Sequence, residues 1–239
     1  MDEIFDINTL FGPFPMAHSD LAIDSLLLQM QQNQIRGACT YSTLGLLLDA
    51  TVGNSATRAA CGDHGELLPV ASLNPTTYFG NKASLANLKG DGFRMARLFP
   101  TPHQYNADYA PFTALVKDLS ATPLPLVVQI EARGELSTFA QALAGYPSAV
   151  VFANVDTAHL AELIAVLKSR PNLYVETSQL NGVGAIRTVA ETVGVDRLLL
   201  GTGAPYQPVT SAIKVLEFSG LSQEARRQIL GENARRILA

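Results

Sequence analysis

The fold is decided by residues 125–178, which run PLVVQIEARGELSTFAQALAGYPSAVVFANVDTAHLAELIAVLKSRPNLYVETS. Three short runs in this stretch, 125–131, 149–155 and 172–178, are almost continuously apolar, which is typical of strands buried on both faces of a parallel sheet. Between them, apolar residues recur three and four positions apart, as on one face of a helix. The stretch therefore predicts two successive strand–helix–strand units.

The same alternation continues toward both ends of the chain. Five more strands are predicted, at Ile4–Leu10, Arg36–Ser42, Leu67–Asn74, Gly92–Phe99 and Arg197–Thr202. Helical patterns separate most of them, although the second and third connections, 54–61 and 81–88, fit either short helices or irregular turns. Two more helices are predicted near 208–218 and 222–238. Eight strand–helix units in 239 residues predict an α/β protein with a single (β/α)8 TIM-like barrel domain over 1–239 and an extra C-terminal helix.

An open doubly wound sheet is the alternative fold. Such a sheet usually carries a glycine-rich phosphate turn after its first strand. Here the corresponding segment, residues 9–15, is TLFGPFP and has no G-x-G-x-x-G pattern. The sequence therefore favours the barrel.

The composition excludes several classes of function. The net charge is −4, with no basic excess to neutralise phosphates, so we expect no nucleic-acid partner. Two cysteines, Cys39 and Cys61, are too few for a disulfide scaffold or a cysteine-rich zinc module. The acidic start MDEIFDIN lacks the basic residues of a secretory signal, and no apolar run is a convincing membrane span. We expect a cytoplasmic protein with no membrane partner.

Polar side chains cluster at the predicted carboxyl ends of the strands, where barrel enzymes hold their active sites. Glu131 and Glu176 are predicted as the catalytic acid and base, because two differently solvated carboxyl groups in one cavity can divide these roles. Either Arg94 or Arg97 could bind an anionic substrate, but their spacing of three points them to opposite faces of a regular strand. The predicted substrate-binding residues are Asn8, Arg94, Arg97, His103, Gln129, Asn154 and Thr202.

Five segments resemble the amidohydrolase-related metal-dependent hydrolases, in order along the chain. They are DINTLFGPFP (6–15), GFRMARLFP (92–100), PNLYVETSQL (171–180), GVDRLLLGTGAPYQP (194–208) and LSQEARRQILGENARRILA (221–239). The resemblance implies a (β/α)8 barrel that binds one or two divalent metal ions to activate water for hydrolysis. It also admits decarboxylation or hydration, which some members of the family perform.

The positions that the resemblance assigns to metal ligands hold other residues in this sequence. The family pattern has a His-x-His pair after strand one, where Asn8 and Leu10 stand, and a histidine after strand five, where Gln129 or Glu131 stands. It has a histidine after strand six and an aspartate after strand eight, in place of Asn154 and Gly203 here. We therefore expect no metal and no other cofactor at the usual site.

Three functions remain open at this point. The first is a metal-independent hydrolase or decarboxylase of a small anionic carbonyl compound, acting through the two glutamates. The second is a catalytically inactive descendant that binds a ligand or regulates, in which the glutamates serve as ion-pair partners and the amides fill the vacated positions. The third is a metallohydrolase with a displaced site built from His18, His103, Glu131 or Asp156. The oligomeric state does not follow from the sequence.

Overall fold

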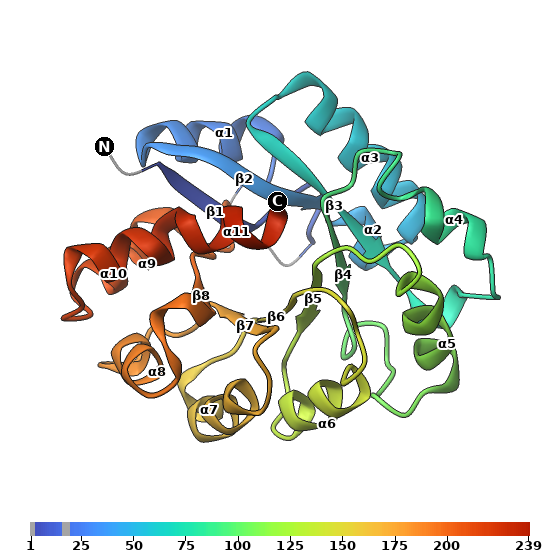
Figure 1. The fold of residues 1–239 in the computed structure, drawn as a ribbon. Coiled ribbons are helices and arrows are strands. Elements are labelled where there is room, and N and C mark those ends of the chain that lie inside the picture. The colour runs from blue at the N-terminus through green and yellow to red at the C-terminus, as the bar shows by residue number, and fades with distance from the viewer. Residues whose placement is uncertain (1–2, 16–19) are drawn as a thin grey trace.

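The computed structural model describes residues 3–15 and 20–239 and contains one eight-stranded parallel sheet in the order β1 to β8 (Figure 1). This confirms the predicted (β/α)8 barrel. The strands are β1 Ile4–Phe11, β2 Ile35–Ser42, β3 Leu67–Leu73, β4 Met95–Leu98, β5 Leu126–Gln129, β6 Val150–Ala153, β7 Leu173–Glu176 and β8 Leu198–Leu199.

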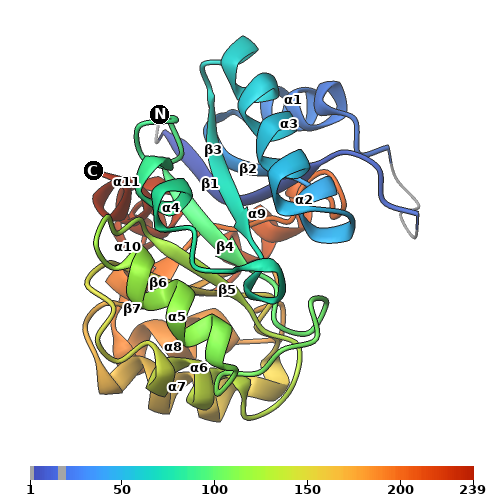
Figure 2. The same cartoon turned by 90° about the vertical axis from the view of Figure 1, so that its right-hand side faces the viewer.

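Helices follow the strands, and most of them surround the sheet in both views (Figures 1 and 2). Both uncertain connections contain helices. The helices are α1 Ile23–Gln32, α2 Leu44–Leu47, α3 Ala50–Asp63, α4 Lys82–Asn87, α5 Ala110–Leu119, α6 Glu135–Ala142, α7 Leu160–Ser169, α8 Ala185–Val193, α9 Val209–Glu217, α10 Gln223–Arg227 and α11 Asn233–Leu238. A π-helical turn, Gln228–Glu232, joins α10 to α11, so the predicted C-terminal helix is present with an irregular centre. Within the described residues, no helix has the length and apolar character needed to cross a membrane.

The barrel closes where β1 meets the segment that follows β8. The Ile7 amide donates to the Leu200 carbonyl at 2.9 Å, and the Gly203 amide donates to the Asn8 carbonyl at 2.8 Å. Strand β8 has only two residues, so these hydrogen bonds, made by residues after its end, hold β1 against this segment at the carboxyl side of the barrel. They bring the polar residues after β8 beside those of β1.

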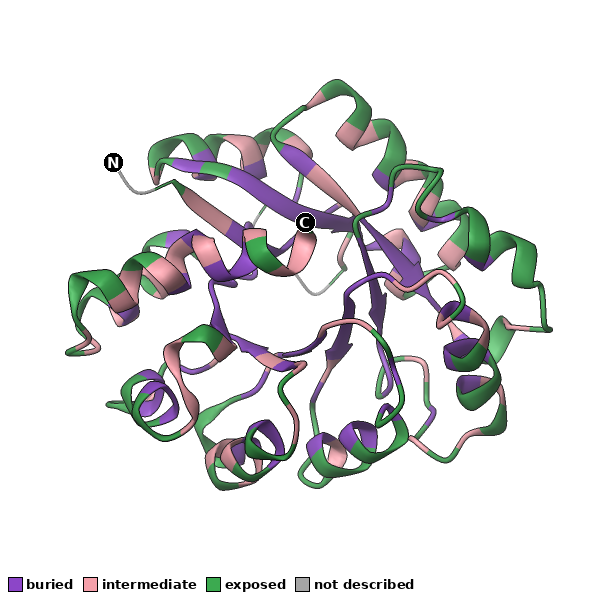
Figure 3. Cartoon of the chain, in the orientation of Figure 1, coloured by how far each residue is buried: buried purple, intermediate pink, exposed green. Residues whose placement is uncertain are grey.

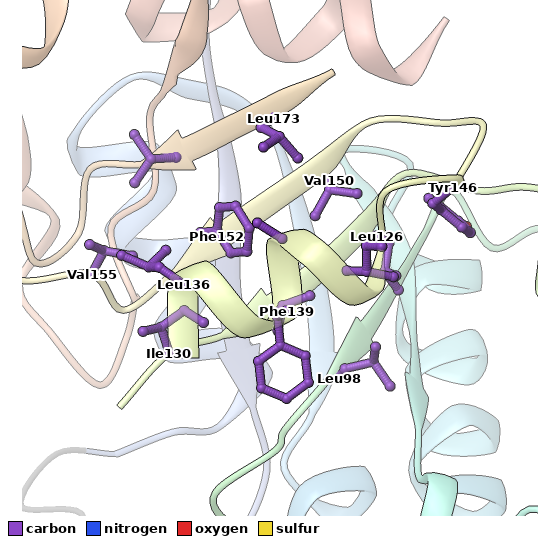
Figure 4. Close-up of a cluster of buried hydrophobic side chains, with 14 of the residues drawn as sticks. Leu98, Leu126, Ile130, Leu136, Phe139, Tyr146, Val150, Phe152, Val155 and Leu173 are labelled. Carbon is purple, nitrogen blue, oxygen red and sulfur yellow. The ribbon is translucent and has the colours of Figure 1, made fainter. Parts of the chain in front are cut away.

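The core has two layers, which explains why the strand sequences are almost continuously apolar. Along β6, Val151 belongs to the cluster inside the barrel, whereas Val150 and Phe152 belong to the cluster between sheet and helices. Figure 4 shows Phe152 in this outer cluster, together with Phe139 of α6. Figure 3 shows the strands as buried and the outer faces of the helices as exposed. Burial on both faces removes the polar alternation of a half-exposed sheet.

Strands β2 and β3 separate toward their carboxyl ends, and α3 fills the gap. Their pairing stops at Thr40 and Pro69, after which the Asn54 side chain bonds both the amide and the carbonyl of Ser72, at 2.7 and 3.0 Å. Helix α3 approaches α2 so closely that a Cβ on Gly53 would lie 2.2 Å from the Gly45 nitrogen. This close packing positions α2 at the mouth of the barrel.

Candidate functional site

A cavity of about 180 Å³ opens at the carboxyl ends of the strands. Its apolar side is formed by Leu10, Phe14, Tyr41, Leu46 and Tyr206. Its polar side is formed by Asn8, Arg97, Gln129, Asn154, Ser178, Gln179 and Gln207. A larger groove of about 730 Å³ lies outside the barrel, against α3 and α4, and contains none of the predicted site residues. The mouth cavity is therefore the candidate site.

Arg97 lies at the centre of the polar side and is only 4% exposed. Its Nη1 donates to Asn8 Oδ1 at 2.7 Å, and its Nη2 donates to Gln129 Oε1 at 3.0 Å. The guanidinium carbon lies 4.7 Å from the ring centre of Tyr41 and 5.3 Å from that of Phe99, within cation–π range. No carboxylate among the described residues forms an ion pair with it. The site thus holds a buried cation whose polar partners are neutral amides.

The two arginines occupy different ends of β4. The strand begins at Met95, three residues later than the sequence predicts, so Arg94 precedes it and is exposed near the amino end. Arg97 is near the carboxyl end and faces the cavity. The structure therefore selects Arg97 from the pair that the sequence left open.

The three predicted amide residues all line the cavity. Asn8 and Gln129 hold Arg97, and Gln129 also donates from Nε2 to Glu131 Oε1 at 2.8 Å. Asn154 has a left-handed backbone (φ 63°), and its Nδ2 donates to the Ile130 carbonyl at 3.0 Å. Its Oδ1 has no hydrogen-bond donor within the described residues and remains available to a ligand.

The two predicted glutamates have very different surroundings. Glu131 is exposed at the edge of the mouth and reaches the cavity lining only through Gln129. Glu176 is 0% exposed. Its carboxylate accepts hydrogen bonds from the backbone N–H groups of Asn154 and Ser178 and from the Ser178 hydroxyl, at 2.7 to 2.8 Å. A Cβ on Gly201 would lie 2.0 Å from Glu176 Oε2, so only glycine leaves room for this carboxylate. The structure does not bring the two carboxyl groups together in the cavity.

His103 and Thr202 stand behind the cavity wall. Since a carbonyl only accepts, His103 Nε2 is the donor in its 3.1 Å bond to Leu46, whose side chain lines the cavity. Burial lowers the pKa of His103. Thr202 is buried and donates from Oγ1 to Asp6. Neither residue lines the cavity, so each can influence a ligand there only through its neighbours.

Sequence reasoning did not select several residues of the cavity wall as binding residues. Phe14 and Tyr206 form an edge-to-face aromatic pair with ring centres 5.5 Å apart at the rim. Gln179 and Gln207 add two half-buried amides. Phe14 and Gln179 follow the ends of β1 and β7 by three residues, and Tyr206 and Gln207 follow the end of β8 by seven and eight. A consistent inspection of longer segments after each strand would select all four.

A comparison with family models agrees with the family resemblance of the sequence. The model of the amidohydrolase family matches residues 80–239, about two thirds of the chain. The chain belongs to the amidohydrolase family. No curated protein matches it.

Several solved structures resemble this family member over its whole length, at identities that show the fold alone. The 5-carboxyvanillate decarboxylase of Sphingomonas paucimobilis is 11% identical, with a TM-score of 0.78 and coverage of 100% of this chain and 99% of that one. The 2,6-dihydroxybenzoate decarboxylase from Rhizobium is 13% identical, with a TM-score of 0.76 and the same coverages. A dihydroxybenzoic acid decarboxylase from Polaromonas sp. JS666, with bound manganese and 2-nitroresorcinol, is 13% identical, with a TM-score of 0.79 and coverages of 100% and 97%.

The donor set of this amidohydrolase-family chain does not fit the divalent metal that the family resemblance implies. Asn8 and Gln129 turn their amide oxygens toward a guanidinium, and the side chains of Leu10 and Gly203 have no ligand atoms. In residues 3–15 and 20–239, no three histidine, cysteine, aspartate or glutamate side chains gather where a metal ion could bind. The hypothesis of a displaced metal site therefore finds no ligand cluster in this part of the chain. His18, one of its candidate ligands, lies outside the described residues.

Asp6 is completely buried, with its carboxyl group bonded to Thr202 and to the backbone of Asn8, and it gives a prediction for pH dependence. Burial raises the pKa of Asp6 from 3.8 to about 7. The hydrogen bonds that it accepts from Thr202 and from the backbone N–H of Asn8 lower the pKa and offset part of this effect. Between these pKa values the folded state holds a proton that the unfolded state releases. This group's contribution to stability is therefore largest below pH 4 and is lost as the pH rises to about 7, by at most about 1.4 kcal/mol per pH unit.

Denaturation from pH 4 to 8 would measure this effect as the difference in unfolding free energy between wild type and Asp6→Asn. The difference should fall with rising pH and level off above about 7. A constant difference across this range would contradict the assignment, because carboxylates elsewhere titrate equally in both proteins.

Proposed function

We propose that this barrel binds a small planar carboxylate at its mouth without a metal ion, with Arg97 as the counter-ion. The observation that carries the proposal is a buried guanidinium that lines the cavity and has only amide oxygens as polar partners. Moving a charge out of water is costly unless an opposite charge compensates it. Each Nη atom carries a second N–H, so the planar fork suits a ligand carboxylate.

The size and walls of the cavity favour a ligand with one ring. Its volume, about 180 Å³, is below the range of pockets for drug-sized ligands, whereas about 150 Å³ suffices to hold benzene. Tyr41, Phe14 and Tyr206 supply flat aromatic surface. The similar structures named for decarboxylation of 5-carboxyvanillate and 2,6-dihydroxybenzoate act on acids of this size, which supports a one-ring carboxylate here.

Decarboxylation is the reaction that this arrangement favours over hydrolysis. Hydrolysis needs a base that activates water, and the described lining holds no carboxylate or imidazole. Decarboxylation breaks the bond between ring and carboxylate carbon, releases CO2, leaves the electron pair on the ring and requires a proton there. Arg97 would orient the acid. The proton would come from bulk water, and Glu131, exposed at the mouth and hydrogen-bonded to Gln129, would take it up and pass it through a water molecule in the cavity to the ring carbon.

Calorimetric titration of protein dialysed against a chelator tests the binding proposal. Benzoate and 2-hydroxybenzoate should bind saturably at one site, and elemental analysis should find no stoichiometric metal. Binding that appears only after manganese or zinc is added would contradict metal independence. Failure of both acids to bind would contradict the carboxylate site itself.

Glu131→Gln tests the proposed proton donor. For any acid that wild type decarboxylates, measured as released CO2, the variant should lower kcat at least about 100-fold, the usual contribution of a positioned proton donor. KM should change little, because Glu131 lies outside the cavity lining. An unchanged kcat would contradict this role, and Asp108→Asn, an exposed carboxyl outside the cavity, is the matched control.

Ligand binding without turnover is the second candidate function. The observation that favours it is the engagement of the Glu176 carboxylate in three internal hydrogen bonds, which makes it unavailable for acid–base work. Saturable binding of these acids with no CO2 release or hydrolysis of the corresponding esters would support it. Detectable turnover would contradict it.

A further inference from the structure

The loop between β7 and α8 contains Asn181-Gly182, and no other asparagine in the sequence precedes glycine. A glycine nitrogen can reach the side chain before it with little hindrance, because glycine has no Cβ. Asn181 is exposed. Neither its carboxamide nor the backbone N–H of Gly182 forms a hydrogen bond with any described residue. The two groups are therefore free to react with each other.

Packing against the segment after β6 requires glycine at position 182. A Cβ on Gly182 would overlap the side chain of Thr157, in the 3-10 helix Thr157–His159. The loop is also held on both sides, since Leu180 is completely buried and the Ala185 amide donates to the Gly182 carbonyl at 3.0 Å. The structure thus imposes the residue type that leaves the preceding asparagine most reactive.

Two other pairs with a small second residue are restrained by hydrogen bonds. Asn54 precedes a serine inside α3, but its carboxamide bonds the backbone N–H and carbonyl of Ser72 at 2.7 and 3.0 Å. Asp91 precedes Gly92, but the Gly92 N–H donates to the Lys89 carbonyl at 3.1 Å. In each of these pairs a reacting group is engaged, whereas the pair in the loop after β7 has no such restraint from the described part of the chain.

We infer that Asn181 is a site of spontaneous deamidation in the folded protein. The Gly182 nitrogen forms a bond to Cγ of Asn181, and the side-chain nitrogen leaves as ammonia with the proton of the Gly182 N–H. Water then opens the resulting succinimide at either carbonyl, which yields aspartate or isoaspartate. The product carries one more negative charge than the −4 of the sequence, and isoaspartate adds one methylene to the backbone. Asn181 does not line the mouth cavity, so this reaction is independent of the proposed carboxylate site.

Peptide mass mapping of the wild-type protein, after incubation at mildly alkaline pH and body temperature, tests the inference. In the folded protein, conversion at Asn181 should be at least about tenfold faster than at Asn54, whose two hydrogen bonds must open first. In urea, which unfolds the chain, conversion at Asn54 should accelerate at least about tenfold, whereas conversion at Asn181 should change less than about threefold.

Asn181→Gln and Asn106→Gln are the matched variants. Asn106 is likewise exposed and lies outside helices and strands, but it precedes alanine, whose Cβ hinders the reaction. During incubation, wild type and Asn106→Gln should accumulate a more acidic species on anion exchange at equal rates. Asn181→Gln should lose most of this species, because the longer glutamine side chain would have to close a larger ring.

An unchanged Asn181 in the folded protein, whatever its fate in urea, overturns the inference, because the fold would then restrain this pair. An acidic species that persists in Asn181→Gln at the wild-type rate also overturns it, since its source would be another residue. Isoaspartate at position 181, detected by methyl transfer to the isolated peptide with an isoaspartyl methyltransferase, supports the succinimide route.

Discussion

Arg97→Met is expected to abolish carboxylate binding without destabilising the empty protein. Loss of one partner from a desolvated charge pair costs about 2–5 kcal/mol, so the Kd should rise at least about 30-fold. The guanidinium has no carboxylate partner among the described residues, so its burial is uncompensated when no ligand is bound. Methionine fills the space between Tyr41 and Phe99 with sulfur–aromatic contact instead. The Tm of the unliganded variant should equal or exceed that of wild type.

Calorimetry and thermal melting check both halves of this expectation. Arg94→Met is the matched control, because Arg94 is exposed and lies outside the cavity, so it should leave the Kd unchanged. If Arg97→Met fails to fold, Arg97→Lys decides the question. It keeps the charge but loses the planar fork, and binding should weaken by an intermediate amount. An unchanged Kd in folded Arg97→Met would refute the counter-ion role.

Glu176→Gln is expected to cause the second large effect, on stability. The Glu176 carboxylate accepts one hydrogen bond from each of three groups, which are the backbone N–H of Asn154, the backbone N–H of Ser178 and the Ser178 hydroxyl. An amide side chain must turn its NH2 group toward at least one of these donors in a completely buried place. The free energy of unfolding should fall by about 2–4 kcal/mol, from one lost charged bond and one unsatisfied donor.

Urea denaturation measures this change, with Glu131→Gln as the internal control. Glu131 is exposed, so its substitution should alter stability by less than about 0.5 kcal/mol. The opposite result for Glu176→Gln, wild-type stability with turnover lost, would assign it the catalytic role that the sequence predicted. The pair of variants therefore separates a structural carboxylate from a chemical one.

Residues 92–99 show what a local sequence pattern can predict about the direction of side chains and what it cannot. The period of a strand established that Arg94 and Arg97 could not face the same side. The choice between them required the strand boundary, since β4 begins only at Met95 and leaves Arg94 at the exposed end. Strand boundaries depend on which neighbour each backbone group pairs with, and this information is not local.

The two glutamates show the same limit. Each glutamate stands at the end of an apolar strand: Glu131 lies two residues beyond β5, and Glu176 is the last residue of β7. Their environments differ because the segment after β8 passes close to Glu176, where Gly201 leaves space for the carboxylate. Two hydrogen bonds to Glu176 come from neighbouring Ser178, but the third comes from Asn154, 22 residues away, and the space for the carboxylate is left by Gly201 after the next strand.

The amino-acid sequence was sufficient to predict the barrel and the order of its strands along the chain. These properties follow from hydrophobic periodicity and residue identity, which are local. The sequence did not predict that the guanidinium of Arg97 in β4 is held by side-chain amides of β1 and β5, 89 and 32 residues away. Such contacts exist only when the barrel closes, because closure brings all eight strand ends around one small volume and sets which side chains are desolvated together.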